Sequence, residues 1–201
     1  MTELWLIRHG QTDWNLEGRY QGQSDVPLNA AGLAQAEAFA ASLDGQAFAA
    51  LYSSDLARAY QTAQAISART GLPIHVDRRL REINQGEWQG RTLDQIRAVY
   101  NEGTRARNVT IDPVTARAPG GESVLEVSRR MAAAADDIAQ AHPDGRVLVA
   151  GHGLALATLI CQARGIPLEQ VYTFIPENTQ ATIIEWGGKI HHRDTEAQRK
   201  P

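Results

Sequence analysis

Short apolar runs alternate along this chain with longer stretches of helical periodicity. The runs at 3–7 ("ELWLI") and 147–150 ("VLVA") are typical of buried strands. Residues 50–53 and 74–76 have weaker strand character. Residues 180–186 are β-branched and partly alternating, which predicts a late strand, with a hairpin to 189–192 across Gly187-Gly188.

The intervening stretches predict helices. Asn29 is a suitable N-cap for a helix over 30–43, with Leu33, Ala36, Phe39 and Leu43 on one face. Residues 55–69 place four apolar side chains at helical spacing: Leu56, Ala59, Ala63 and Ile66. Capping-box patterns at 92–95 and 123–126 open two more helices, the second with an apolar side formed by Val127, Met131, Ala134 and Ile138. Residues 154–163 predict a buried helix.

Strands that alternate with helices predict an α/β fold. We expect a three-layer sandwich with a mostly parallel central sheet flanked by helices, formed by one domain over 1–201 with a helical, lid-like insertion at about 91–118. In such sheets, ligand sites lie beyond the carboxyl ends of the strands. The polar stretch at 191–201 is expected to fray.

Composition narrows the class of protein. A hydrophobic content of 43%, a charged content of 21% and a net charge of -3 are typical of a globular protein and do not favour a nucleic-acid binder. The single cysteine, Cys161, argues against a disulfide framework and a cysteine-based zinc site, and fits a reducing compartment. We find no signal-peptide pattern and no apolar run long enough to span a membrane, so we expect a cytoplasmic protein.

Two apolar runs end in the same dipeptide, His-Gly. Arg8-His9-Gly10 follows the first run, and His152-Gly153 follows another. Arg58 and Glu82 stand at comparable strand ends, so the fold class favours their convergence with the two histidines at one pocket.

The combination of residue types suggests phosphoryl transfer. Guanidinium groups suit phosphate or carboxylate oxygens, a neutral imidazole is a competent nucleophile, and a carboxyl group can protonate a leaving alkoxide. No metal is required on this reading. Taken singly, each residue has a simpler explanation: a structural histidine, a solvated arginine, or Glu82 paired with Arg79 or Arg81. A zinc site is disfavoured by the adjacent arginine and the lack of a zinc-binding motif.

The motifs, taken in order, resemble the histidine phosphatase superfamily, in its phosphoglycerate mutase-like branch of small phosphatases. The similar segments are "LIRHGQTDWN", "YQGQSDVPLNAAGLAQA", "YSSDLARAYQTA", "LREINQGEWQG", "PGGES" and "VLVAGHG". They arrive in family order and span residues 4 to about 155.

The resemblance implies a role for each site residue. His9 would become phosphorylated, with Arg8, Arg58 and His152 forming the phosphate pocket and Asn15 adding a polar contact. Glu82 would be the general acid and then the base, and Gln21 and Gly22 would lie near the substrate. Gly10 and Gly153 would permit close turns. Gly151 and Leu154 depart from the family pattern, which puts local backbone or substrate contacts in doubt.

The resemblance leaves three functions open. The first is a cofactor-independent, metal-independent phosphatase acting on a small phosphorylated metabolite through a phosphohistidine. The second is a phosphoglycerate mutase dependent on 2,3-bisphosphoglycerate, disfavoured because residues 91–118 are short and lack that branch's Trp-Arg-Arg and Tyr cluster. The third is a non-catalytic phosphate-binding domain.

Two further features stay open. The insertion carries five arginines against three acidic residues. It either favours a substrate with an additional anionic group or is a solvated lid surface. A monomer or a homodimer would both fit the family.

Overall fold

A five-stranded sheet forms the centre of the part of the chain that the structure, a computed structural model, describes: residues 1–105 and 112–187. Its strands are β1 (Thr2–Arg8), β2 (Ala50–Ser53), β3 (Ile74–Val76), β4 (Arg146–Gly151) and β5 (Ala181–Trp186). They lie in the order β3-β2-β4-β1-β5, and only β5 runs antiparallel to its neighbour. The expected mostly parallel α/β sheet is therefore confirmed. The expected hairpin to 189–192 lies outside the described residues.

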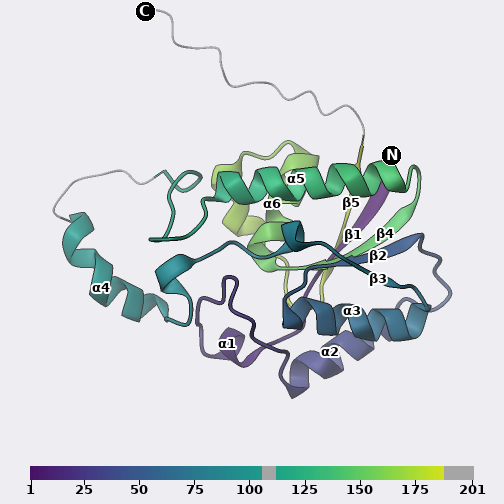
Figure 1. Ribbon diagram of the computed structural model, residues 1–201, viewed down its shortest axis with the longest axis horizontal. Helices are drawn as coiled ribbons and strands as arrows, with labels where there is room; N and C mark the ends of the chain where they lie inside the picture. The colour runs from purple at the N-terminus through teal and green to yellow at the C-terminus, as the bar shows by residue number, and fades with distance from the viewer. Residues whose placement is uncertain (106–111, 188–201) are drawn as a thin grey trace, which may run out of the picture.

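Helices cover both faces of the sheet, which gives the expected three layers (Figure 1). The α-helices are α1 (Asp13–Leu16), α2 (Ala30–Ala41), α3 (Ala57–Thr70), α4 (Leu93–Arg105), α5 (Val124–Ala141) and α6 (Gly153–Arg164). The 3-10 helices are η1 (Arg78–Leu80), η2 (Gly86–Trp88) and η3 (Leu168–Phe174). Helices α2 and α3 pack on one face of the sheet, and α5 and α6 pack on the other.

The alternation of β1 explains how one strand serves both layers. Leu4 and Leu6 belong to the core cluster under α5 and α6, whereas Ile7 belongs to the cluster under α2 and α3, with Trp5 packed against it. Successive side chains of a strand point to opposite faces. A strand buried on both faces therefore appears in the sequence as a continuous apolar run.

The three predicted helix caps are confirmed, whereas the helix predicted from residue 55 begins at Ala57. Asn29 caps α2 by accepting a hydrogen bond from the Gly32 amide at 2.8 Å. Ser123 and Glu126 form the reciprocal capping box of α5. The box at Thr92 and Gln95 is also present, with backbone-to-side-chain bonds of 2.9 and 3.3 Å. These local signals work because the first amides of a helix have no partner within the helix.

One predicted helix face is wrong in part. Leu33 of α2 is 44% exposed, and the buried residues of this helix are Gly32, Ala36 and Ala40. The helix turns its smallest residues inward because its first turn approaches the backbone of Gln11: a Cβ on Gly32 would lie 2.0 Å from that carbonyl oxygen. Periodicity alone does not reveal so close an approach.

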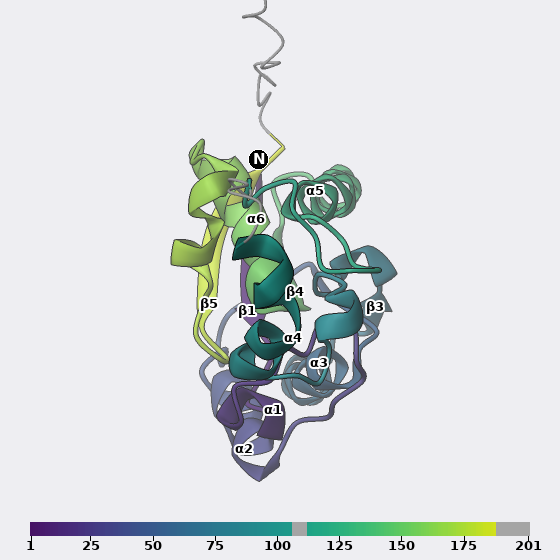
Figure 2. The same ribbon diagram turned by 90° about the vertical axis from the view of Figure 1, so that its left-hand side faces the viewer.

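The carboxyl ends of β1, β2 and β4 meet at one edge of the sheet. Arg8 is in register with Gly151, and Ser53 with Ala150. The chain therefore leaves three adjacent strands side by side, and the residues that follow them are neighbours. Helices α1 and α4 lie at this end of the molecule (Figure 2). Among the described residues, no helix is long and apolar enough to cross a membrane.

Candidate active site

His9 follows β1 directly and is almost fully buried, with 3% of its surface exposed. Its Nδ1 lies 2.7 Å from the carbonyl oxygen of Gly10. Because a carbonyl can only accept, Nδ1 carries the proton and Nε2 has a free lone pair. Arg58 Nε donates to this Nε2 at 3.3 Å. The backbone therefore selects the tautomer in which Nε2 can act as a nucleophile.

Arg58 lies in the first turn of α3 and is 1% exposed. Its Nη1 donates to the carbonyl of Ser24 at 2.8 Å, and its Nη2 donates to the carbonyl of Gly22 at 2.7 Å. Burial lowers the pKa of Arg58 to about 10, which leaves it protonated near neutral pH. A buried, fixed positive charge thus stands beside the lone pair of His9.

His152 follows β4 and is completely buried. The Ser54 hydroxyl accepts from the Leu56 amide at 3.3 Å and lies 2.9 Å from His152 Nε2. A hydroxyl group can both donate and accept, so Ser54 is compatible with either neutral tautomer of His152. The Nδ1 atom is buried and has no hydrogen-bond partner in the described part of the chain. The rings of His152 and His9 have centroids 5.3 Å apart.

Arg8 brings a second guanidinium group to the same end of the sheet. Its Nη1 donates to the carbonyl of Pro176 at 2.7 Å, while its buried Nε has no partner among residues 1–105 and 112–187. Burial lowers its pKa, opposed by the nearby charges of Glu82 and Glu177. Arg8 therefore offers a buried N–H, and His152 a buried ring nitrogen, that have no partner among the described residues; with a proton on Nδ1 of His152, both suit an oxyanion.

Both histidines are held neutral. Burial is the main reason that the pKa of His9 lies well below its ordinary value of 6.5, and the positive charge of Arg58 lowers it further. Burial and Arg58 lower the pKa of His152 in the same way. An imidazole that stays neutral near pH 7 keeps its lone pair for nucleophilic attack.

These shifts predict how stability depends on pH. In the unfolded chain both imidazoles take up a proton as pH falls below about 6.5, whereas in the folded protein they do so only at lower pH. Below about pH 6.5 the unfolded state therefore binds more protons than the folded state. As the pH is lowered, the free energy of unfolding should fall by up to about 1.4 kcal/mol per pH unit for each imidazole. Urea unfolding between about pH 7 and pH 5 measures this slope. His152→Asn should reduce it, and a slope unchanged by that substitution would contradict the assignment.

Glu82 occupies the loop after η1 and reaches the start of α6. Its Oε1 accepts from the amides of Ile83 at 2.9 Å and Ala155 at 3.0 Å, and its Oε2 accepts from Leu154 at 3.1 Å. The N-cap residue of α6, His152, supplies no side-chain cap. Glu82 therefore satisfies amides at the start of this helix from a distant part of the chain.

The simpler explanation of Glu82 as a surface ion pair is wrong. Arg81 donates to both carboxylate oxygens of Asp55, at 2.6 and 2.5 Å. Arg79 binds Asp77 and Asp137, each at 2.7 Å. Both neighbouring arginines are thus engaged elsewhere, and the carboxylate of Glu82 is directed to the end of the sheet where the histidines lie.

Of the remaining predicted site residues, Gly22 contacts this cluster directly, and Asn15 and Gln21 lie in the same segment between β1 and α2. Asn15 Oδ1 accepts from the backbone and hydroxyl of Thr12, each at 3.1 Å, in the cap of α1. Gly22 has φ 52° and offers its carbonyl to Arg58. The buried Oε1 of Gln21 has no partner in the described ranges. Their direct part in substrate binding stays a prediction.

Glycines 10 and 153 serve close packing rather than an unusual turn. Neither has a positive φ. A Cβ on Gly10 would lie 2.4 Å from the carbonyl oxygen of Gly32, and one on Gly153 would lie 2.9 Å from Ile175 Cγ2. The expectation of close turns is corrected: the missing side chains at Gly10 and Gly153 allow Gly32 and Ile175 to approach the backbone beside the two histidines.

Three residues at the site escaped the sequence reasoning. Ser54 contacts His152, Thr62 Oγ1 accepts from the Gly10 amide at 3.1 Å, and Asn178 Nδ2 donates to the His9 carbonyl at 2.8 Å. Ser54 could have been found, since it follows β2 at the same sheet edge. Nothing in the sequence around Asn178 signals that its loop folds back onto His9.

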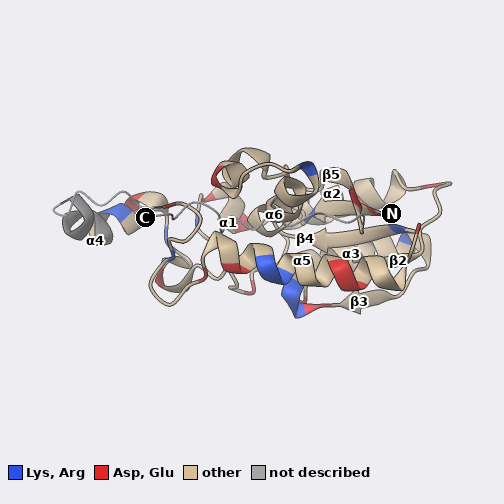
Figure 3. Cartoon of the chain, turned by 90° about the horizontal axis from the view of Figure 1, so that it is seen from above, with Lys and Arg blue, Asp and Glu red and all other residues tan. Residues whose placement is uncertain are grey.

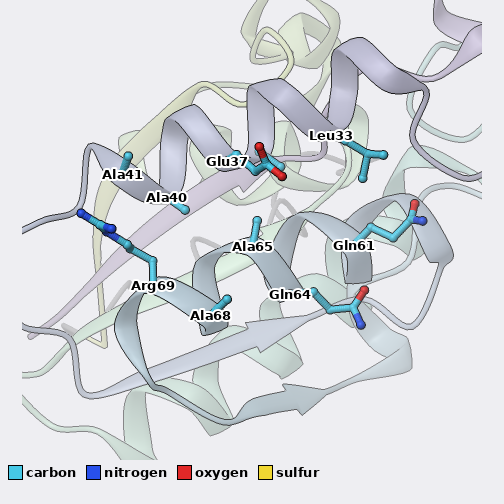
Figure 4. Close-up of a pocket in the computed structure, with 10 residues that line it drawn as sticks. Leu33, Glu37, Ala40, Ala41, Gln61, Gln64, Ala65, Ala68 and Arg69 are labelled. Atoms are coloured by element: carbon cyan, nitrogen blue, oxygen red, sulfur yellow. The ribbon is translucent and has the colours of Figure 1, made fainter.

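A groove between α2 and α3 is separate from these residues (Figure 4). Its volume is about 460 Å³, and half of its lining residues are alanines, with Glu37 and Arg69 among the polar ones. It contains none of the predicted site residues. The described residues also contain no group of three or more His, Cys, Asp or Glu side chains placed to hold a metal ion.

The fold and the site define a class of protein suited to phosphate: two neutral imidazoles, one buried guanidinium group and one partly buried guanidinium group at the carboxyl end of a mostly parallel sheet. The family model of the histidine phosphatase superfamily (branch 1) matches residues 4–192. The chain therefore belongs to the histidine phosphatase superfamily, as its motifs predicted.

Known relatives include proteins with different names. The chain is 38% identical over 167 residues to "Probable phosphoglycerate mutase GpmB" of Yersinia pestis, covering 83% of this chain and 77% of the relative. The mycobacterial glucosyl-3-phosphoglycerate phosphatase, solved with VO3, is 34% identical with a TM-score of 0.80 and 90% of each chain covered. Phosphoserine phosphatase from Entamoeba histolytica, solved with phosphoserine, is 29% identical with a TM-score of 0.77, covering 91% of this chain and 90% of that one.

Proposed function

We propose that this protein is a phosphomonoesterase that hydrolyses a small phosphorylated metabolite through a phosphohistidine at His9. The observation that carries the proposal is the environment of His9 Nε2: a lone pair fixed by the Gly10 carbonyl and facing a buried arginine at 3.3 Å. The neutral state of His9 and the unpartnered buried nitrogens of Arg8 and His152 support it.

In the first step, Nε2 of His9 attacks phosphorus as the bond to the ester oxygen breaks. Arg58 Nε turns from the lone pair to a phosphoryl oxygen. Arg8 and His152 Nδ1–H contribute further donors to the charge on the phosphoryl group. Glu82, protonated at this stage, gives its proton to the leaving oxygen. Its Oε2, with one amide partner against two for Oε1, is the oxygen better placed to carry that proton.

In the second step, water attacks the phosphohistidine. Glu82, now a carboxylate, takes a proton from the water as the oxygen–phosphorus bond forms and the phosphorus–nitrogen bond breaks. Inorganic phosphate leaves, and His9 regains its lone pair. The proposed mechanism needs no metal ion, because cationic side chains stabilise the negative charge on the phosphoryl group.

Three residues are proposed to contact the substrate. Asn15 spends its carbonyl oxygen on Thr12, which leaves its amide nitrogen for a phosphoryl oxygen. Gln21 offers a buried acceptor for a hydroxyl group of the substrate. Gly22 acts through its carbonyl, which holds Arg58.

The insertion at 91–118 is proposed as the lid of this site. Helix α4 lies at the carboxyl end of the sheet (Figure 2), and residues 106–111 lie outside the described chain. Two of its arginines have acidic partners: Arg97 with Asp94 at 3.8 Å, and Arg117 with Glu126 at 3.2 Å. Asp94 belongs to the segment itself, so only the outside partner, Glu126, reduces the positive surplus that the sequence suggested. The short length of the lid supports hydrolysis by water over retention of the phosphoryl group.

The test is release of inorganic phosphate from a panel of phosphomonoesters, run beside 3-phosphoglycerate with and without 2,3-bisphosphoglycerate. We expect release from one or a few compounds, unchanged by a chelator such as EDTA. Bisphosphate-dependent interconversion of phosphoglycerates would instead make the protein a mutase. Activity lost to the chelator and restored by a divalent metal would contradict the metal-independent mechanism.

A further inference from the structure

Arg130 of α5 donates three hydrogen bonds to the loop that carries Glu82 and two to the carboxylate of Glu122. An arginine has five N–H donors, and all five are engaged here. Nη1 donates to the carbonyls of Arg79 and Arg81 at 2.7 and 2.6 Å, and Nη2 to the carbonyl of Glu82 at 2.9 Å. Nε and Nη2 form a fork with the carboxylate of Glu122, at 2.9 and 3.0 Å.

Glu122 completes the hold on this loop. Its Oε2 also accepts from the Asn84 amide at 2.8 Å, and its own amide donates to the Asn84 carbonyl at 2.8 Å. The side chains of Arg130 and Glu122 are 18% and 24% exposed, so the pair is largely shielded from solvent. In Figure 3 the basic stretch of α5 lies beside acidic segments. The backbone on both sides of Glu82 is therefore fixed by one ion pair.

The same network reaches the phosphate end of the site. Gln23 Nε2 donates to the Glu82 carbonyl at 3.1 Å and to Glu122 Oε2 at 3.4 Å. Gln23 stands between Gly22 and Ser24, whose carbonyls hold Arg58. The position of the acid is thus tied to the guanidinium that faces His9.

We propose that Arg130 and Glu122 are positioning residues, which hold the Glu82 carboxyl group within hydrogen-bond reach of the leaving oxygen of the substrate. This inference rests on the proposed function of Glu82 as the acid. Arg130 contacts no reacting atom. Its effect should appear only in the step that needs the acid, since misplacing a proton donor by a small distance costs more for a basic leaving group.

The experiment compares Arg130→Lys with wild type on glycerol phosphate and 4-nitrophenyl phosphate. Lysine keeps the charge but lacks the planar fork. We expect kcat for the alkyl ester to fall by about tenfold or more relative to the aryl ester. Arg129→Lys, on the exposed neighbouring position, is the matched control and should leave the ratio unchanged. Because both rates come from one sample, their ratio is independent of the fraction of folded protein.

Two further variants separate positioning from stability. Glu122→Gln weakens the fork without removing Arg130, and it should also lower the ratio of kcat for the alkyl ester to kcat for the aryl ester. In a Glu82→Gln background, Arg130→Lys should lower it no further, because there is no acid left to position. An unchanged ratio in both Arg130→Lys and Glu122→Gln, with Glu82→Gln still lowering it, would overturn this inference alone. No effect of Glu82→Gln, or no turnover by wild type, would overturn it together with the proposed function.

Discussion

His9→Ala should abolish turnover of every phosphomonoester, with a loss of at least about 10³-fold in kcat. The proposed intermediate forms on His9 Nε2. The ring of His152 lies beside that of His9, with centroids 5.3 Å apart, but its Nε2 faces Ser54. Phosphate release under saturating substrate measures the loss, and circular dichroism shows whether the fold is kept.

His75→Ala is the matched control for this substitution. His75 is an exposed histidine on β3, and its ring lies against Tyr52. Its removal should leave kcat unchanged. Comparable turnover by the His9→Ala variant and the control would show that His9 is not the nucleophile, even if the variant binds phosphate with altered affinity.

Glu82→Gln should slow the enzyme unequally for different leaving groups. Alkyl esters have a basic leaving oxygen that needs the proton, so we expect a loss of about 10²- to 10⁴-fold for glycerol phosphate. The loss for 4-nitrophenyl phosphate should be much smaller, because nitrophenolate leaves without protonation. The ratio of the two kcat values, determined before and after substitution, is the measurement.

The control is Glu169→Gln, an exposed carboxylate in η3, which should change neither rate. Glu82 also binds the first amides of α6, so thermal unfolding of the variant should be followed in parallel. Equal losses for both esters would contradict the role of a leaving-group acid and leave Glu82 with a structural role in capping α6.

Much of the fold could be predicted because its signals are local. The apolar run of β1 and the capping residues Asn29 and Ser123 lie within a few residues of the elements they define. The same is true of the site's strand-borne residues. Parallel strands end at one edge, so a histidine directly after each of two strands is brought to that edge by topology alone.

The remainder depends on contacts between distant segments. The inward face of α2 is set by the approach of Gly32 to Gln11, and the loop of Asn178 closes on His9 from across the sequence. Glu82 is directed by amides of α6 and by Arg130 of α5. Local patterns in one sequence give no information on such pairings, so Glu82 could be singled out from its motif, whereas the residues that hold it in place could not.

The central claim is that phosphate passes through a covalent bond to His9. The most direct measurement mixes the enzyme with a 32P-labelled phosphomonoester, quenches it rapidly in alkali, and maps the label by peptide mass spectrometry. The mechanism predicts an alkali-stable, acid-labile phosphohistidine at His9, formed faster than phosphate is released and absent in His9→Ala. Turnover without any labelled histidine, or label at another residue, would contradict it.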